Sequence, residues 1–169
     1  MPGDRVVYLY QGSYRPTPVR LEERILSRDG EKLVIDDQLT SGSDQRHWRM
    51  HVTDTPENER ANKIDELVEV AQDGSERRLD KRDLLRLFAG TFLRPDGKQT
   101  DVVTTRTTCD VLGRRYPCTA TSAKQSVGGV VCTTHEAESD AFAWTHVSAD
   151  YVKPDGSLLY RVSVIDLAP

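Results

Sequence analysis

Apolar and polar residues alternate along most of this chain, which is the pattern of half-buried β-strands. The alternation is clear in four runs of the first third, residues 6–10, 19–25, 33–39 and 48–52. Side chains of a strand point to opposite faces in turn, so a period of two places one apolar face against a core. These runs therefore predict strands that are buried on one side.

Turn signals are dense between the apolar runs. The dipeptide Asp-Gly favours tight hairpins because both residues tolerate a positive φ. It occurs at Asp29-Gly30, Asp73-Gly74, Asp96-Gly97 and Asp155-Gly156. Gly128-Gly129 is a further candidate turn or bulge. We expect antiparallel hairpins at these positions.

The last third is the most strand-like part of the chain. Strands are predicted over residues 102–111, 116–122, 127–135, 141–151 and 157–167. Residues 62–71 fit a helix or a strand, and residues 54–61 have the polar composition of an exposed loop. We expect a mainly β (α+β) fold, a curved antiparallel sheet or open β-barrel of about eight to ten strands with one or two helices. A β-sandwich is the alternative, and residues 1–169 are expected to form a single domain.

One segment, residues 80–89, has the pattern of a helix. Asp80 can accept hydrogen bonds from the first helical amides, and Gly90 is a normal helix stop. Leu84, Leu87 and Phe88 follow helical spacing and give the segment a narrow apolar stripe. We expect this helix to cover one face or one mouth of the sheet.

Composition excludes several classes of function. The chain has 169 residues, 30% of them charged and 37% hydrophobic, with a formal net charge of −4. This balance lacks the basic face that a nucleic-acid-binding protein needs. No apolar run approaches the length of about 18 residues that a membrane helix requires. We expect no nucleic-acid partner and no transmembrane segment.

The amino terminus bears on the compartment. It reads Met1-Pro2-Gly3, without an apolar signal segment behind it. Either the protein is cytosolic, or an export signal has been removed ahead of a first strand that begins almost at once. We slightly favour the periplasm or cell envelope over the cytoplasm.

Two of the three cysteines, Cys109 and Cys118, fit a cross-strand disulfide. If Gly113-Arg114 is a two-residue turn, Cys109 lies directly opposite Cys118 at a non-hydrogen-bonded position. In that register Pro117 occupies a hydrogen-bonded position although it has no N–H, which requires a bulge or an edge. In a reducing cytosol the pair would stay as thiols.

The third cysteine supports weaker alternatives. We interpret Cys132 as a small buried side chain. A nucleophilic pair of Cys132 with His135 or His146 is conceivable, although Cys132 and His135 would point to opposite faces of one strand. A zinc site of Cys109, Cys118, Cys132 and His135 lacks the usual short ligand spacing. We therefore predict no catalytic residue, no metal and no cofactor.

Aromatic and large apolar side chains recur on the predicted strands and on the helix. In a curved sheet such side chains can line an apolar pocket, or they can simply fill the core. The candidates for a ligand pocket are Tyr8, Tyr10, Trp48, Leu84, Phe88, Phe142, Trp144 and Tyr160.

Three stretches resemble bacterial envelope lipoprotein domains of the lipoprotein-carrier type. They are the opening Gly3-Asp4-Arg5-Val6-Val7-Tyr8, the helix around Leu84-Leu85-Arg86-Leu87, and the closing strand with Asp155-Gly-Ser-Leu-Leu-Tyr160. The resemblance implies an unclosed β-barrel with a helical lid and no catalysis. It also implies an apolar ligand or a protein partner at the concave face.

Three functions remain as hypotheses. The first is a non-enzymatic binding or structural domain, the soluble part of an exported or envelope-associated bacterial protein, with an apolar small molecule or a protein as its partner. The second is a cytosolic interaction or assembly subunit, which would carry free thiols. The third is an enzyme that uses Cys132 with His135 or His146.

Overall fold

The structure is a computed structural model, and it describes residues 1–61, 63–80, 82–83, 92–93, 95–142 and 147–169. The chain divides into two compact units. Unit 1 comprises residues 1–8, 19–91 and 166–169, and unit 2 comprises residues 9–18 and 92–165. Strands β1 (Arg5–Gln11) and β11 (Leu158–Ala168) each contribute residues to both units. That residues 1–169 form one domain stays a prediction.

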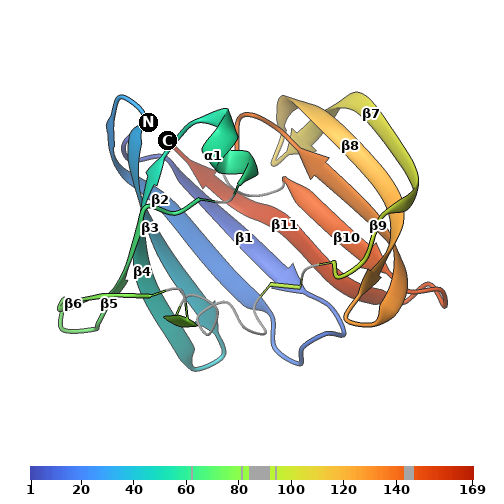
Figure 1. The fold of residues 1–169 in the computed structure, drawn as a ribbon, viewed down its shortest axis with the longest axis horizontal. Coiled ribbons are helices and arrows are strands. Elements are labelled where there is room, and N and C mark those ends of the chain that lie inside the picture. The colour runs from blue at the N-terminus through green and yellow to red at the C-terminus, as the bar shows by residue number, and fades with distance from the viewer. Residues whose placement is uncertain (62, 81, 84–91, 94, 143–146) are drawn as a thin grey trace. The chain divides into compact units, whose positions relative to one another are not determined.

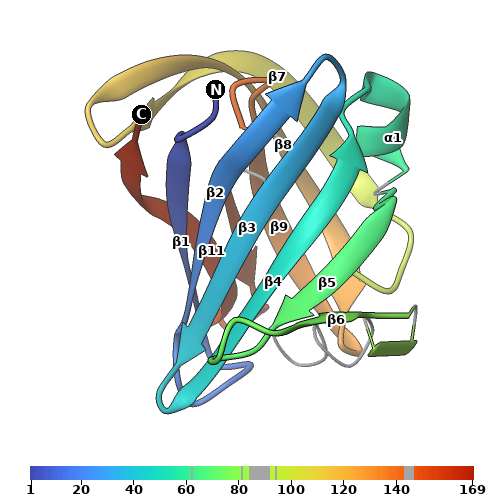
Figure 2. The same ribbon diagram turned by 90° about the vertical axis from the view of Figure 1, so that its left-hand side faces the viewer.

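Unit 1 is built from consecutive hairpins (Figure 2). Its elements are β2 (Val19–Asp29), β3 (Lys32–Ser41), β4 (Asp44–Thr53), α1 (Pro56–Arg60), β5 (Glu66–Val70) and β6 (Glu76–Arg78). Neighbouring strands from β2 to β6 pair antiparallel and follow chain order. The ambiguous residues 62–71 thus include a strand, β5, whereas the predicted loop 54–61 contains the short helix α1.

Unit 2 holds the other hairpins (Figure 1). Its elements are β7 (Thr100–Val111), β8 (Arg114–Val127), β9 (Val130–Glu138) and β10 (Ser148–Val152), together with most of β11. Neighbouring strands from β7 to β11 pair antiparallel. The strand breaks predicted at residues 123–126 do not occur, because β8 runs without interruption to the Gly128-Gly129 turn.

The described strands form one open antiparallel sheet in the order β6-β5-β4-β3-β2-β1-β11-β10-β9-β8-β7. The sheet begins at β6 and ends at β7, so it does not close into a barrel, and it is not split into a sandwich. The predicted mainly β fold with an open sheet is confirmed, with eleven described strands where about eight to ten were expected.

Three of the four Asp-Gly pairs join hairpins as predicted. They lie between β2 and β3, between β5 and β6, and between β10 and β11. Asp96-Gly97 does not join two paired strands. The N–H of Asp96 instead donates to the carbonyl oxygen of Ser126 near the end of β8, at 2.9 Å.

The start of the predicted helix is partly described. Asp80 Oδ1 accepts hydrogen bonds from the N–H groups of Arg82 and Asp83, at 2.7 and 2.9 Å, as a helix cap does. Leu84, Leu87, Phe88 and the other residues of 84–91 lie outside the described residues.

The core of unit 1 lies on one face of its strands. Leu33, Trp48 and Val52 are almost completely buried there. A carboxyl group, Asp37, lies among them at 1% exposure, opposite Glu23 of β2 and Trp48 of β4. The unit therefore buries an acidic side chain inside an apolar layer.

No helix in the described part of the chain is long and apolar enough to cross a membrane.

Candidate functional site

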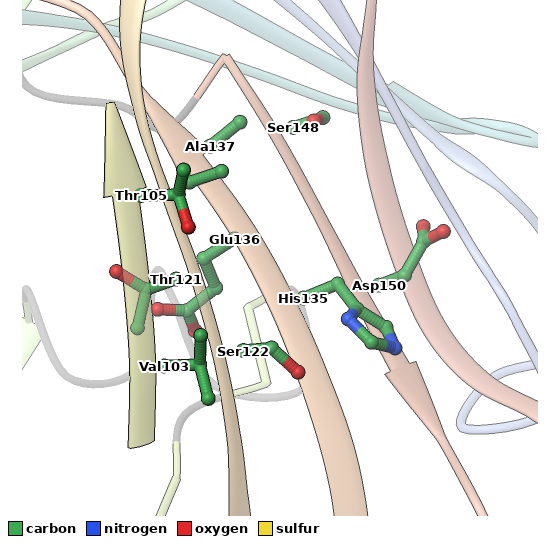
Figure 3. A pocket seen from close by; sticks show the side chains of 10 residues that line it. Val103, Thr105, Thr121, Ser122, His135, Glu136, Ala137, Ser148 and Asp150 are labelled. Carbon is green, nitrogen blue, oxygen red and sulfur yellow. The ribbon is translucent and has the colours of Figure 1, made fainter. Parts of the chain in front are cut away.

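A shallow hollow of about 280 Å³ is lined by residues of β7 to β10 in unit 2 (Figure 3). Its residues are Val103, Thr105, Ala120, Thr121, Ser122, His135, Glu136, Ala137, Ser148 and Asp150. Strand register explains the hollow, because Thr105, Ala120, Ala137 and Ser148 form one row across four strands. The side chains in that row are small, so the surface there is lower than at the neighbouring, larger side chains.

A second row of the hollow brings together Ser122, His135 and Asp150. Ser122 lies opposite His135, and His135 lies opposite Asp150. The Gly128-Gly129 turn sets the first pairing, so this pairing could have been read from the sequence. The row as a whole is not evident in the sequence, because its three residues come from three strands.

The row does not form a nucleophilic triad in the structure. Both carboxylate oxygens of Asp150 accept hydrogen bonds from Arg161, at 2.7 and 2.8 Å. Within the described residues, no hydrogen bond joins Ser122 to His135 or His135 to Asp150. A triad needs the base to touch both the nucleophile and the orienting acid. The geometry is that of a polar surface with room for a small side chain.

Aromatic rings gather on the other side of unit 2. Tyr160 is in ring contact with Tyr10, Tyr14 and Tyr151, with centroids 6.2, 5.3 and 4.8 Å apart, and Tyr10 also meets Phe92 at 5.0 Å. We call these five residues the aromatic cluster. Tyr10, Tyr151 and Tyr160 are buried, whereas Tyr14 and Phe92 are partly exposed. The cluster is a rigid apolar wall with two rings that a ligand could reach.

Polar groups at the margin of the cluster are paired. The Tyr151 hydroxyl donates a hydrogen bond to Glu136 Oε1 at 3.1 Å. Burial raises the pKa of this hydroxyl, and the negative charge of Glu136 raises it further. Tyr151 therefore stays protonated and serves as a fixed donor that anchors one end of the cluster.

A glycine brings the loop after β1 onto the cluster. Gly12 has φ 137°, and the following N–H groups of Ser13 and Tyr14 donate to the carbonyl oxygens of Leu158 and Leu159, both at 3.2 Å. A Cβ at position 12 would lie 2.7 Å from the carbonyl carbon of Leu159. The close approach places the ring of Tyr14 against Tyr160.

A disulfide joins Cys109 and Cys118 in the structure, with their Cα atoms 5.8 Å apart. The predicted register was wrong. The turn is Leu112-Gly113, with φ values of 54° and 78°, so Cys109 faces Tyr116 and Cys118 faces Thr107. The cysteines are diagonal neighbours on one face, two residues out of the expected direct pairing.

The observed register also resolves the difficulty with proline. Pro117 now faces Thr108, at a non-hydrogen-bonded position where no N–H toward β7 is needed. The pairing of β9 with β8 begins only at Thr119. The missing N–H of Pro117 thus removes no hydrogen bond from either neighbouring strand.

The described residues that were candidates for a nucleophilic pair or a zinc site around Cys132 do not come together in the structure. Cys132 is a buried free thiol, and burial raises its pKa. His135 lies on the opposite face of β9, in the hollow, and His146 lies outside the described residues. Because Cys109 and Cys118 are bonded to each other, two of the four candidate zinc ligands are not available. Among the described residues no group of three or more histidine, cysteine or acidic side chains could hold a metal ion.

The predicted pocket residues are distributed over different places. Tyr8 and Trp48 belong to the core of unit 1, and Tyr10 and Tyr160 belong to the aromatic cluster of unit 2. Phe142 packs against Tyr116 with ring centroids 5.1 Å apart. The other candidates, Leu84, Phe88 and Trp144, lie outside the described residues. Whether these side chains bind a ligand stays a prediction.

No family model and no curated protein matches this sequence. Solved structures do match its fold over nearly the whole chain. A protein classed as exported, with a YmcC-like fold, from Bacteroides fragilis is 8% identical with a TM-score of 0.50, and the match covers 100% of this chain and 97% of that one. A protein classed as a lipoprotein from Parabacteroides distasonis gives 8% identity and a TM-score of 0.50, covering 99% and 96%.

A hypothetical protein from Chlamydia trachomatis is similar too. It is 11% identical with a TM-score of 0.52, and the match covers 99% of this chain and 87% of that one. At these identities the likeness concerns the fold alone. The resemblance to bacterial envelope lipoprotein domains, expected from three stretches of sequence, is thus confirmed at the level of architecture.

Proposed function

We propose that this chain is a non-enzymatic binding domain of an exported, envelope-associated bacterial protein. The observation that carries the proposal is the Cys109–Cys118 disulfide in the exposed β7–β8 hairpin. Disulfides on exposed strands persist in oxidising compartments and are reduced in the cytosol. The shared fold with proteins classed as exported and as a lipoprotein supports the same compartment.

The aromatic cluster is the surface that we propose for an apolar ligand. Three of its rings are buried and hold the wall in place, and the rings of Tyr14 and Phe92 remain accessible at its edge. Rigid aromatic side chains give a large apolar contact at a small cost in conformational entropy. An acyl chain or a similar apolar group is the ligand chemistry that fits.

The non-enzymatic part of the proposal is supported by the state of the reactive side chains. Asp150 is engaged by Arg161 and does not orient His135. The Cys132 thiol is buried with a raised pKa, which disfavours the nucleophilic thiolate. Asp150 and Cys132 are therefore poorly placed to take part in a reaction.

The first test is the intact mass of protein recovered from an oxidising compartment, measured without reductant. We expect a mass two hydrogens below that of the three-thiol chain, which shifts up by two hydrogens on reduction. The matched control is the Cys109→Ser/Cys118→Ser variant, which should show no shift. A wild-type chain that keeps three free thiols would contradict export and favour the cytosolic assembly subunit.

The second test measures binding of the apolar dye N-phenyl-1-naphthylamine by fluorescence titration. Tyr14→Ala and Phe92→Ala should each weaken dye binding by about fivefold or more, since one aromatic contact is worth about 1 kcal/mol. Tyr116→Ala is the matched control, because its ring packs on Phe142 and not on the cluster. Equal affinities for all four proteins would disprove the aromatic cluster as the binding site. The assignment to an exported protein would be unaffected, because the mass measurement tests it separately.

A further inference from the structure

The outer edge of β7 is a long, exposed edge of the described sheet. Residues 100–108 are all exposed, with Val102 at 50% and Val103 at 62%. β7 is the terminal strand of the sheet, and in Figure 1 no described strand lies beyond it. Among the described strands, none pairs with the outer edge of this twelve-residue strand.

The main chain of β7 defines what can bind there. The two-residue Leu112-Gly113 turn makes Val111–Arg114 a hydrogen-bonded pair, and such pairs alternate along an antiparallel ladder. From Val103 to Val111, odd-numbered residues of β7 therefore direct their N–H and C=O groups to β8, whereas the register is shifted between Thr100 and Val103. Thr104, Arg106, Thr108 and Asp110 direct theirs to the free edge. Only another extended chain satisfies alternating donors and acceptors of this kind.

Between Thr104 and Asp110 the edge has little of the usual protection against strand addition, and the register shift between Thr100 and Val103 interrupts only its beginning. Natural edges are shortened, or carry charges and prolines that discourage pairing. The opposite end of the sheet follows this rule, since β6 has three residues, Glu76–Arg78, and all are charged. In β7, residues 102–109 contain no proline and one charge, Arg106. The disulfide at Cys109 fastens this strand to β8, which keeps its edge extended.

We propose that the free edge of β7 pairs antiparallel with β7 of a second copy of this chain, centred on Thr108. This goes beyond the proposed binding function. In this register Thr108 faces Thr108 of the second copy, and Arg106 faces Asp110 of the second copy. By symmetry the reverse ion pair forms as well. All three facing pairs use residues whose main-chain groups point to the free edge, so they form hydrogen-bonded pairs.

Charge selects this register over its neighbour. Centring the pair on Arg106 instead would place the two guanidinium groups opposite each other, which is unfavourable across strands. Moving the centre by one residue, to Thr107, would place Arg106 opposite Thr108 of the second copy, so neither ion pair would form. Arg106 and Asp110 are four residues apart, so they face each other across the two copies only when the pair is centred on Thr108, midway between them.

The first test is sedimentation equilibrium of the full chain from about 10 µM to 1 mM, the range suited to a small interface. We expect reversible dimers, with association weakened at least about fivefold in Arg106→Asp and in Asp110→Arg, because each turns two attractive pairs into two repulsive ones. The double variant Arg106→Asp/Asp110→Arg should recover association. A wild type that stays monomeric at 1 mM, or a double variant no better than the single ones, would overturn the proposal.

Asp110→Arg also removes the hydrogen bond from the Gly113 N–H to Asp110 Oδ1, so a second readout avoids this residue. Thr108→Cys should be cross-linked between copies by a short bis-maleimide, since the two Thr108 positions face each other. Thr104→Cys is the matched control. It is equally exposed, but its two copies would lie about 26 Å apart, four residues on each side of the centre. Equal cross-linking of both variants would overturn this register.

Discussion

Gly12→Ala is expected to destabilise the protein by about 2–5 kcal/mol and to detach Tyr14 from the aromatic cluster. Gly12 has φ 137°, a conformation that costs a residue with a Cβ about 1–3 kcal/mol. The new Cβ would also lie 2.7 Å from the Leu159 carbonyl carbon and 2.9 Å from Tyr160 Cα. Both are backbone atoms, so relief requires the two chain segments to separate, at about 1–3 kcal/mol for overpacking.

Gly156→Ala is the matched control for this prediction. Gly156 also has a positive φ, 82°, but no atom lies within 4 Å of its added Cβ. It should therefore lose only the conformational part, about 1 kcal/mol. Urea unfolding gives both free energies, and the apolar dye titration reports the cluster. If the two variants were equally stable and bound dye equally, the close approach at Gly12 would not matter.

Asp37→Asn is expected to stabilise the protein at pH 7–8 and to flatten the dependence of its stability on pH. Burial raises the pKa of the Asp37 carboxyl well above its usual value, and the charges of Glu23 and Asp36 raise it further, while the Trp48 indole opposes them. Asp37 Oδ1 is buried, and no described residue forms a hydrogen bond with it. Holding a proton is therefore favourable for the folded state, and losing it is costly.

The sign of the pH effect follows from the raised pKa. Between the unfolded-state pKa, about 3.9 for aspartate, and the raised folded-state value, the folded chain binds more protons than the unfolded chain. The contribution of Asp37 to stability is fully present below the unfolded-state pKa and is lost as the pH rises through the folded-state pKa. Asparagine keeps the shape without the charge, so its advantage should grow toward alkaline pH.

Asp36→Asn is the control, one residue away on the other face. Asp36 Oδ1 lies 2.8 Å from His47 Nε2 and accepts a hydrogen bond from Arg49 Nε at 3.0 Å. Neutralising this acid removes favourable pairs and should destabilise the protein at the same pH. The measurement is the urea midpoint from pH 4.5 to 8.5 for the three proteins. An Asp37→Asn variant that is less stable than wild type at pH 8 would refute the interpretation.

Local sequence signals were enough to predict most hairpins. Asp29-Gly30, Asp73-Gly74 and Asp155-Gly156 join paired strands as expected, because their turn geometry depends on neighbouring residues alone. Asp80 caps the amides of Arg82 and Asp83 for the same reason. The period of two in residues 33–39 and 48–52 also identified the buried face of β3 and β4, with Leu33 and Trp48 on it.

Register was harder, because a turn can be placed at more than one position. The sequence allowed a turn at Gly113-Arg114, whereas the structure has it at Leu112-Gly113 with a leucine at φ 54°. The longer pairing of β7 with β8 outweighs the local preference against leucine there, and it puts Pro117 where no N–H is needed. Cys109 and Cys118 can still form a disulfide in the observed register, because both side chains lie on the same face of the hairpin.

The β class, three of the Asp-Gly hairpins and the pairing of Cys109 with Cys118 were predictable from the sequence, because each depends on residues close together in the chain. The contact of Tyr14 with Tyr160 beside Gly12 and the position of β7 at the end of the sheet were visible only in the folded protein. These features join residues far apart in the chain. Their formation depends on packing and strand order, which local propensities and periodicity do not encode.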